Sequence, residues 1–200
     1  MLAKPSRQIL YVATGNTGKF AEFRELINTE RWVLQAMTNL SSVPVHEETG
    51  KTFLENARIK AHAVRSVSRE AVLADDSGLV VPALKGAPGV KSRRYAGPEG
   101  DDAANNAKLI REISAVPSEN RQAEFVCCLV FIDAHGQEYR FMGSVKGTIL
   151  TTPRGEDGFG YDPLFLVEGG AKTMAELSLA EKNQLSHRAL AAKAFLKAFG

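Results

Sequence analysis

The sequence predicts an α/β fold, and three observations support this prediction. Residues 9–13 form an apolar, β-rich run, which is followed by a glycine-containing turn and then by an amphipathic pattern typical of a helix. Residues 71–73 form a second apolar run, which leads into two carboxylates. Residues 124–132 and 138–150 are long β-rich segments, and residues 133–136 between them carry a hairpin signal. Sheets of this class bind ligands beyond the carboxyl ends of their strands.

Composition bounds the class of protein. The chain has 200 residues, 44% hydrophobic and 24% charged, which is ordinary for one globular domain, or for one domain with two lobes. A net charge of +2 is not the basic charge that is typical of proteins binding a nucleic-acid polymer. No apolar run approaches the length that spans a membrane. The first seven residues lack an apolar signal core. Cys127 and Cys128 are adjacent in a strand pattern, so we expect buried thiols and a cytoplasmic protein.

The acidic pair Asp75 and Asp76 is the most informative feature. It follows residues 71–73 and precedes Ser77 and Gly78, so we predict a buried strand that ends in these acids at a Ser-Gly turn. Side chains alternate along a strand, so the two carboxylates should point to opposite faces of the sheet. One of them then faces a cleft. The alternative is an ordinary solvated turn.

The turn after the first strand reads Thr14-Gly15-Asn16-Thr17-Gly18-Lys19. Glycines allow close approach, amides of a helix's first turn point outward, and a lysine adds positive charge, which together favour an anion site. The spacing is not that of the P-loop, because only two residues separate the glycines. An ordinary glycine turn remains the alternative.

A helix over residues 52–66 is predicted by the capping box of Thr52 and Glu55. Glu55, Asn56 and Lys60 fall near a common side of this helix, since residues four or five apart return to similar faces. Glu55 is either a cap or a functional carboxylate. Glu47 and Glu48 precede the helix, as a solvated acidic turn or as metal ligands.

The loop around Phe159 predicts a binding surface for a flat ligand. Glycines flank this aromatic residue, so its ring can be presented while amides near Gly160 read the edge of the ligand. Loop packing is the alternative. His187 and Arg188 open the last helix, where a cation is unfavourable with respect to the helix dipole, and Lys182 lies one turn upstream. An acceptor-rich ligand explains cations at that position.

The other predicted elements are a strand over 32–37, a helix over 101–115, a strand over 164–167 and a short helix over 173–180.

These motifs, in this order, resemble the inosine triphosphatase family, the RdgB/HAM1-type non-canonical purine nucleoside triphosphate pyrophosphatases. The resemblance covers the chain from about Ile9 to Phe199. It rests on the residues 13–19, 47–50, 52–57, 60–61, 74–79, 86–90, 94–97, 158–165 and 186–188.

The resemblance implies hydrolysis of ITP, dITP and XTP to the monophosphate and pyrophosphate with Mg²⁺. It implies a single domain over residues 1–200, built as an elongated mixed β-sheet flanked by helices, with two lobes around a central cleft, and usually a homodimer. Asp76 is implied as proton acceptor and metal-associated residue, and Glu47 and Glu48 as a further source of a metal carboxylate. On chemical grounds we expect Lys60 to be catalytic together with Asp76, and to join Lys19 in neutralising the triphosphate. Substrate contacts are implied for Thr14, Gly15, Asn16, Thr17, Gly18, Lys19, Ser77, Phe159, Gly160, Tyr161, Asp162, Lys182, His187 and Arg188. Arg93 departs from the small residue that is usual in the family at that place.

Two other functions are compatible with parts of this pattern. A Maf-like nucleotide pyrophosphatase shares the reaction but prefers other bases, and the Ser186-His187-Arg188 segment argues against it. A non-catalytic nucleotide-binding module has no need of a water-activating carboxylate such as Asp76.

Overall fold

The computed structural model describes residues 7–27, 29–44, 47–98 and 100–200, so most of the predicted polar lead lies outside it. The described chain divides into two compact units. Unit 1 comprises the chain up to Asp76, Cys128–Met142 and Ala191–Gly200. Unit 2 comprises Ser77–Cys127 and Gly143–Leu190. The single domain with two lobes and a central cleft stays a prediction, and each unit is described by itself.

Six strands form one mixed sheet, in the order β2-β1-β3-β4-β5-β6. Their bounds are β1 Gln8–Val12, β2 Trp32–Ala36, β3 Ala71–Val80, β4 Gln122–Ile132, β5 Glu138–Ile149 and β6 Phe165–Val167. The helices are α1 Thr17–Leu26, α2 Phe53–Arg65, α3 Asp102–Ile113, α4 Leu179–Leu185 and α5 His187–Phe199. Strand β1 is parallel to β2 and β3, whereas β5 and β6 are antiparallel. The predicted α/β class with a mixed sheet is therefore confirmed.

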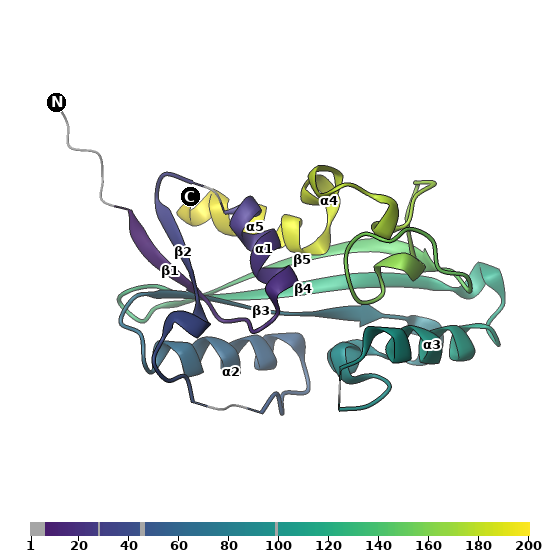
Figure 1. Ribbon diagram of the computed structural model, residues 1–200, viewed down its shortest axis with the longest axis horizontal. Coiled ribbons are helices and arrows are strands. Elements are labelled where there is room, and N and C mark those ends of the chain that lie inside the picture. The colour runs from purple at the N-terminus through teal and green to yellow at the C-terminus, as the bar shows by residue number, and fades with distance from the viewer. Residues whose placement is uncertain (1–6, 28, 45–46, 99) are drawn as a thin grey trace. The chain divides into compact units, whose positions relative to one another are not determined.

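In unit 1, helices cover both faces of the strands. Helix α2 packs Ala57, Ala61 and Val64 against Val72 and Ala74 of β3 and the alternate residues Val130 and Ile132 of β4. Phe131, between those two, points the other way, as the period of a strand requires. Figure 1 shows α2 along one side of these strands and α1 along the other.

The face of unit 1 opposite α2 carries a cluster of aromatic side chains. Phe131 makes ring contacts with Trp32, Phe195 and Phe199, at centroid distances of 5.8, 5.0 and 4.8 Å. The Trp32 indole N–H donates to the Phe199 carbonyl oxygen at 2.8 Å. Aromatic pairs of this geometry each contribute about 0.5–1.5 kcal/mol beyond the area they bury. The cluster therefore fastens the last turns of α5 to unit 1.

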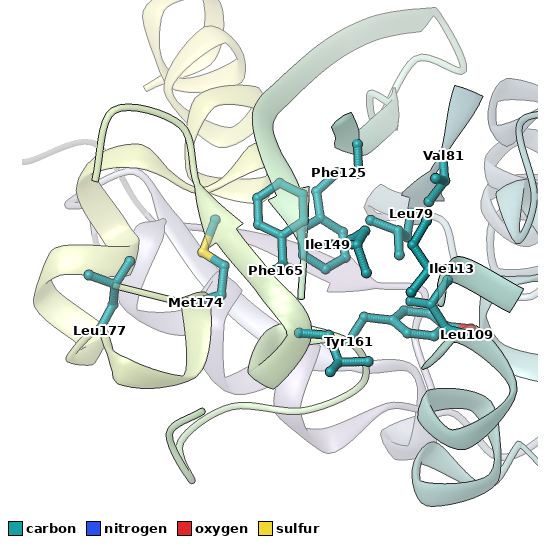
Figure 2. Packing of buried hydrophobic residues seen from close by; sticks show 12 residues of the cluster. Leu79, Val81, Leu109, Ile113, Phe125, Ile149, Tyr161, Phe165, Met174 and Leu177 are labelled. Carbon is teal, nitrogen blue, oxygen red and sulfur yellow. The ribbon is translucent and has the colours of Figure 1, made fainter. Parts of the chain in front are cut away.

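Unit 2 has its own apolar core. Helix α3 contributes Leu109 and Ile113, which pack with Leu79 at the end of β3. Figure 2 shows the rings of Phe125 and Phe165 against each other, at a centroid distance of 4.5 Å. This core supports the loop and the helix starts that carry the predicted substrate contacts in this unit.

The predicted end of the acidic strand is wrong. Ser77 and Gly78 do not form a turn, since β3 continues through them to Val80. Gly78 is buried and Leu79 is fully buried, so tertiary packing overrides the local turn signal. The two acids consequently lie within a ten-residue strand rather than at its end.

The segment 173–180 also differs from the prediction. The Thr173 and Glu176 capping box is present, but it opens a single 3-10 turn, Met174–Glu176. A second capping box, made by Ser178 and Glu181, starts helix α4.

Cys127 and Cys128 are buried thiols, as predicted. Among the described residues, no helix has the length and hydropathy needed to cross a membrane.

Candidate active site

Strand β3 sends its two carboxylates to opposite faces, as predicted. Asp76 faces α2, where the Lys60 ammonium lies 2.9 Å from its Oδ1 and Asn56 Nδ2 donates to its Oδ2 at 3.2 Å. Asp75 faces α1, where Lys19 Nζ lies 2.8 Å from its Oδ2. Both carboxylates are almost fully buried. Unit 1 thus holds two lysine–aspartate pairs, one on each face of a single strand.

Helix α2 positions both partners of Asp76. It begins after Thr52, whose hydroxyl accepts from the Glu55 amide at 3.2 Å. Asn56 and Lys60 are four residues apart, so they share one face of the helix. The Glu55 carboxylate accepts from the Lys51 amide at 2.6 Å and stays on the exposed side of the helix start. Glu55 thus binds a backbone amide at the helix start, as a cap does, but that amide belongs to Lys51 and not to Thr52, as the predicted capping box requires.

Asn56 is a site residue to which the sequence analysis assigned no role. Its Oδ1 accepts from the Gly50 amide at 2.8 Å, so its Nδ2 is directed at Asp76. A Cβ at Gly50 would lie 2.5 Å from that Oδ1, so glycine is required for this close approach. The capping box places Asn56 one turn into the helix, but no local signal shows that its amide meets a carboxylate twenty residues away.

The two glutamates before α2 differ in position. Glu48 Oε1 lies 3.3 Å from Lys60 Nζ, and the residue is half-buried. Glu47 is exposed. Lys60 therefore lies against two carboxylates, those of Glu48 and Asp76. Of the two glutamates, Glu48 is the one that shares a neighbour with Asp76.

Burial and charge set the protonation of this cluster. Burial raises the pKa of Asp76 above 3.8, although the Lys60 and Lys19 ammonium groups act in the opposite direction. Burial acts to lower the pKa of Lys60, but the carboxylates of Asp75, Asp76 and Glu48 outweigh it and raise that pKa. Lys60 is thus held as a cation. The three carboxylates outnumber the two ammonium groups, so the cluster favours additional positive charge.

The glycine turn before α1 is built as a helix start. Asn16 caps the helix through its Oδ1, which accepts from the Lys19 amide at 2.9 Å. The Thr14 hydroxyl accepts from the Asn16 amide at 3.2 Å. Gly15 and Thr17 are exposed and Gly18 is half-buried, so the turn is accessible. Its role as an anion site stays a prediction, and the Lys19 ammonium is paired with the Asp75 carboxylate.

Unit 2 brings together a second set of predicted residues. Lys182 Nζ lies 2.7 Å from Asp162 Oδ2, and the Phe159 amide donates to the same oxygen at 3.3 Å. Arg188 donates from Nη2 to the Ser77 hydroxyl at 3.1 Å, and its guanidinium carbon lies 5.7 Å from the centre of the Phe159 ring. The cations therefore gather around the aromatic residue.

The start of α5 holds buried polar side chains. Arg188 is 2% exposed and His187 is 8% exposed. The His187 ring stacks on Phe125, with centroids 4.9 Å apart and planes 14° apart. Contact of His187 and Arg188 with an acceptor-rich ligand stays a prediction.

The loop before Asp162 has a strict requirement for glycine. Gly158 has φ of +88°, and a Cβ there would lie 2.2 Å from Asp162 Oδ2 and 2.3 Å from Lys182 Nζ. The loop backbone therefore lies directly on the Lys182–Asp162 pair.

Two predicted contact residues serve the protein's own framework. The Tyr161 ring belongs to the core of unit 2, and its hydroxyl donates to the Ser92 carbonyl at 2.8 Å. The Gly160 amide donates to Asp102 Oδ2 at 2.7 Å. Direct contact of either residue with substrate stays a prediction.

Metal binding by side chains alone is not indicated. Over residues 7–27, 29–44, 47–98 and 100–200, no three His, Cys, Asp or Glu side chains are grouped in a way that could hold a metal ion. Mg²⁺ commonly takes only one or two carboxylates and completes its shell with water and phosphate oxygens. Glu48 and Asp76, which share Lys60 as a neighbour, have the oxygen donors that this ion prefers.

Comparison with known proteins places this geometry in a family. The chain matches the Ham1 family over residues 10–198. A dITP/XTP pyrophosphatase of Bdellovibrio bacteriovorus is 47% identical over 191 residues, which cover 94% of this chain and 96% of that protein. One from Bacillus subtilis is 45% identical over 187 residues, which cover 93% and 94%. The solved Ham1 protein of Coxiella burnetii superposes with a TM-score of 0.87 at 38% identity, over 96% of this chain and 98% of that one. Together these matches show that the chain belongs to the Ham1 family.

Proposed function

We propose that this protein hydrolyses the non-canonical purine nucleoside triphosphates ITP, dITP and XTP to the monophosphate and pyrophosphate. The observation that carries the proposal is the buried Asp76 carboxylate, with a raised pKa, held between Lys60 and Asn56. The relatives named dITP/XTP pyrophosphatase, at 45–48% identity, support the same reaction and substrates.

Asp76 acts as the proton acceptor in this proposal. Cleavage of a phosphoanhydride requires a positioned water, an in-line path and neutralised charge more than a covalent nucleophile. Burial raises the pKa of Asp76, and a carboxylate with a raised pKa is a stronger base than an exposed aspartate. The Asn56 amide and the Lys60 ammonium fix its two oxygens, so the carboxylate is held in one orientation.

The lysines bind phosphate oxygens. Lys60 is kept charged by three carboxylates. Lys19 forms an ion pair with Asp75 and lies next to an accessible glycine turn. We assign Lys60 and Lys19 to the triphosphate, together with the amides of the turn before α1. Ammonium groups neutralise the charge that is transferred to the leaving pyrophosphate.

The carboxylates of Glu48 and Asp76 fit Mg²⁺. Their oxygens suit a hard cation, and their cluster has more negative than positive groups. When bound, the ion neutralises phosphate charge and polarises the bond that is cleaved. Of the two predicted glutamates, we assign Glu48, since Glu47 is exposed and Glu48 shares Lys60 with Asp76.

Base selection is assigned to the cluster of unit 2. Hypoxanthine and xanthine carry an acceptor oxygen at position 6, whereas adenine carries a donor amine there. Lys182, His187 and Arg188 are donors, so adenine leaves a buried donor without a partner. A site of this kind rejects the mismatched base by orders of magnitude. The Phe159 ring supplies the flat contact surface.

The two other functions have weaker support. Membership of the Ham1 family argues against a Maf-like pyrophosphatase. The buried, oriented Asp76 argues against a module that only binds nucleotide. The homodimer and the cytoplasmic location stay predictions.

The test is pyrophosphate release by the purified chain from ITP, XTP, ATP, GTP and dTTP, with Mg²⁺ and with EDTA. We expect rapid release from ITP and XTP, release from ATP lower by orders of magnitude, and loss of activity in EDTA. Equal rates with ITP and ATP contradict the assigned base selection. Release of orthophosphate in place of pyrophosphate contradicts the assigned reaction.

A further inference from the structure

We propose that Asp102 and Asn106 of α3 are positioning residues that hold the Phe159 loop, residues 158–162, in the conformation that selects the base. The inference rests on the proposed function and deepens it. Asp102 Oδ2 accepts from the Gly160 amide at 2.7 Å, and Asn106 Nδ2 donates to the Gly160 carbonyl oxygen at 2.9 Å. Helix α3 therefore binds both backbone polar groups of one residue of the loop.

The spacing on α3 makes this clamp possible. Asp102 and Asn106 are four residues apart, so their side chains lie on the same face of the helix. Asp101 performs the capping, because its Oδ1 accepts from the Ala103 and Ala104 amides at 2.8 and 3.3 Å. The Asp102 carboxylate is directed instead to Gly160.

The loop needs such a clamp because of its glycines. Gly158 and Gly160 flank Phe159 and have φ of +88° and +62°. Glycine has more conformational freedom to lose than any other residue, so a loop of this composition is costly to order. Residues 152–158 are exposed, so little packing restrains the chain before Phe159.

The clamp is next to the residue whose ring meets Arg188. Phe159 precedes Gly160, and its own amide is bound by Asp162. Its ring lies 5.7 Å from the Arg188 guanidinium carbon. With the peptide groups on both sides of Phe159 fixed, the ring is preorganised, which lowers the entropic cost of binding a flat ligand. Asp102 and Asn106 therefore act on base binding through Gly160, without touching the substrate.

A purely structural role of Asp102 at the start of α3 is the competing explanation. An acid in the first turn stabilises a helix through its dipole, by about 0.3–1 kcal/mol. Asp101 offers a matched control, because it is the neighbouring acid of the same helix and its carboxylate binds the Ala103 and Ala104 amides. A comparison of substitutions at the two aspartates therefore separates an effect on helix stability from an effect on the position of the loop.

The experiment compares Asp102→Ala, Asp102→Asn, Asn106→Ala and Asp101→Ala. Steady-state kinetics are measured with ITP and with ribose 5-triphosphate, which has no base. For Asp102→Ala we expect KM for ITP to rise about tenfold, as for a lost charge-assisted hydrogen bond, with kcat within a factor of about two. Kinetics with the base-free substrate should not change. Asp102→Asn keeps an acceptor oxygen and should restore most of the affinity for ITP. Asn106→Ala should raise KM for ITP as Asp102→Ala does.

Asp101→Ala should lower the melting temperature and leave KM for ITP unchanged. Equal KM changes for Asp101→Ala and Asp102→Ala, or an equal loss with ribose 5-triphosphate, would overturn the proposal. Hydrogen exchange gives a readout that does not depend on activity. The Gly160 amide should exchange faster in Asp102→Ala than in Asp101→Ala, and equal exchange would overturn the clamp. If the wild-type chain hydrolyses no nucleoside triphosphate, the proposed function fails, while the exchange rates still decide whether the clamp exists.

Discussion

Both units contain a buried lysine–aspartate pair, and the two pairs have different surroundings. In unit 1, Lys60 and Asp76 are 2.9 Å apart, and in unit 2, Lys182 and Asp162 are 2.7 Å apart. The four side chains are 8–13% exposed, so burial alone does not distinguish the pairs. The neighbours do. Glu48 and Asp75 make the first cluster acidic, whereas Arg188 adds a donor at Phe159, whose amide binds Asp162 of the second pair.

This difference shows how one kind of ion pair can support two tasks. In unit 1, burial raises the pKa of Asp76, and the acidic surplus around Lys60 favours a cation, which suits base catalysis and a metal. A surplus of donors suits an acceptor-rich ligand. The pairs should therefore respond differently to substitution, and the following experiments test that difference.

The largest effect is expected from Asp76→Asn. The amide keeps the size of the side chain but cannot accept a proton, so kcat with ITP should fall by about 10²–10⁴. Asp162→Asn is the matched change in unit 2, and it should act mainly on KM. Pyrophosphate release measured over a range of ITP concentrations separates the two parameters. A wild-type kcat for Asp76→Asn would remove Asp76 from the chemistry.

The site could be predicted from sequence to the extent that it depends on local pattern. Alternation along a strand predicts Asp75 and Asp76 on opposite faces, and Thr52 as the N-cap predicts the start of α2. The partners of these residues could not be predicted in this way. Asn56 meets Asp76 across 20 residues, and Gly160 meets Asp102 across 58. Such contacts depend on how elements pack, which a single sequence does not specify.

The same limit explains the error at Ser77 and Gly78. Their types favour a turn, but burial of Gly78 and Leu79 keeps the chain extended. Tyr161 follows Gly160, the loop glycine next to Phe159, but its ring lies in the core of unit 2, which the local sequence does not indicate. Local propensity is a weak guide wherever burial opposes it.

The second effect is expected from Lys182→Met. This change leaves Asp162 without its ammonium partner and removes a donor near Phe159, so KM for ITP should rise about 10–100-fold. The effect on kcat should be smaller. Lys172→Met is a matched control, because Lys172 pairs with Glu181 at 2.8 Å but is 54% exposed. Equal KM values for the two variants would contradict the assigned role of the buried pair.

A smaller effect separates the two glutamates of unit 1. Glu48→Gln should raise the Mg²⁺ concentration that gives half-maximal activity by on the order of tenfold, since it removes one carboxylate from the acidic cluster. Glu47→Gln should leave that concentration unchanged, because Glu47 is exposed. Titration of activity with Mg²⁺ at saturating ITP measures the difference. The reverse result would assign the metal to Glu47.

The smallest effect is on stability, where Asp76→Asn should raise the melting temperature at neutral pH. The folded protein holds a proton on Asp76 more tightly than the unfolded chain does, because burial raises this pKa above 3.8. The stability that protonated Asp76 contributes is fully present below pH 3.8, and it is lost as the pH rises through the folded pKa. Asparagine does not titrate, so the variant does not lose this stability. Its stability relative to the wild type should therefore increase as the pH rises through the folded pKa of Asp76. Each kcal/mol corresponds to roughly 2–4 °C in a chain of this size. Melting temperatures of both proteins, measured without metal from pH 3.5 to 7.5, should diverge as the pH rises. A variant that is less stable than the wild type at pH 7 would mean that the attraction between Lys60 and Asp76 outweighs the burial of its charge.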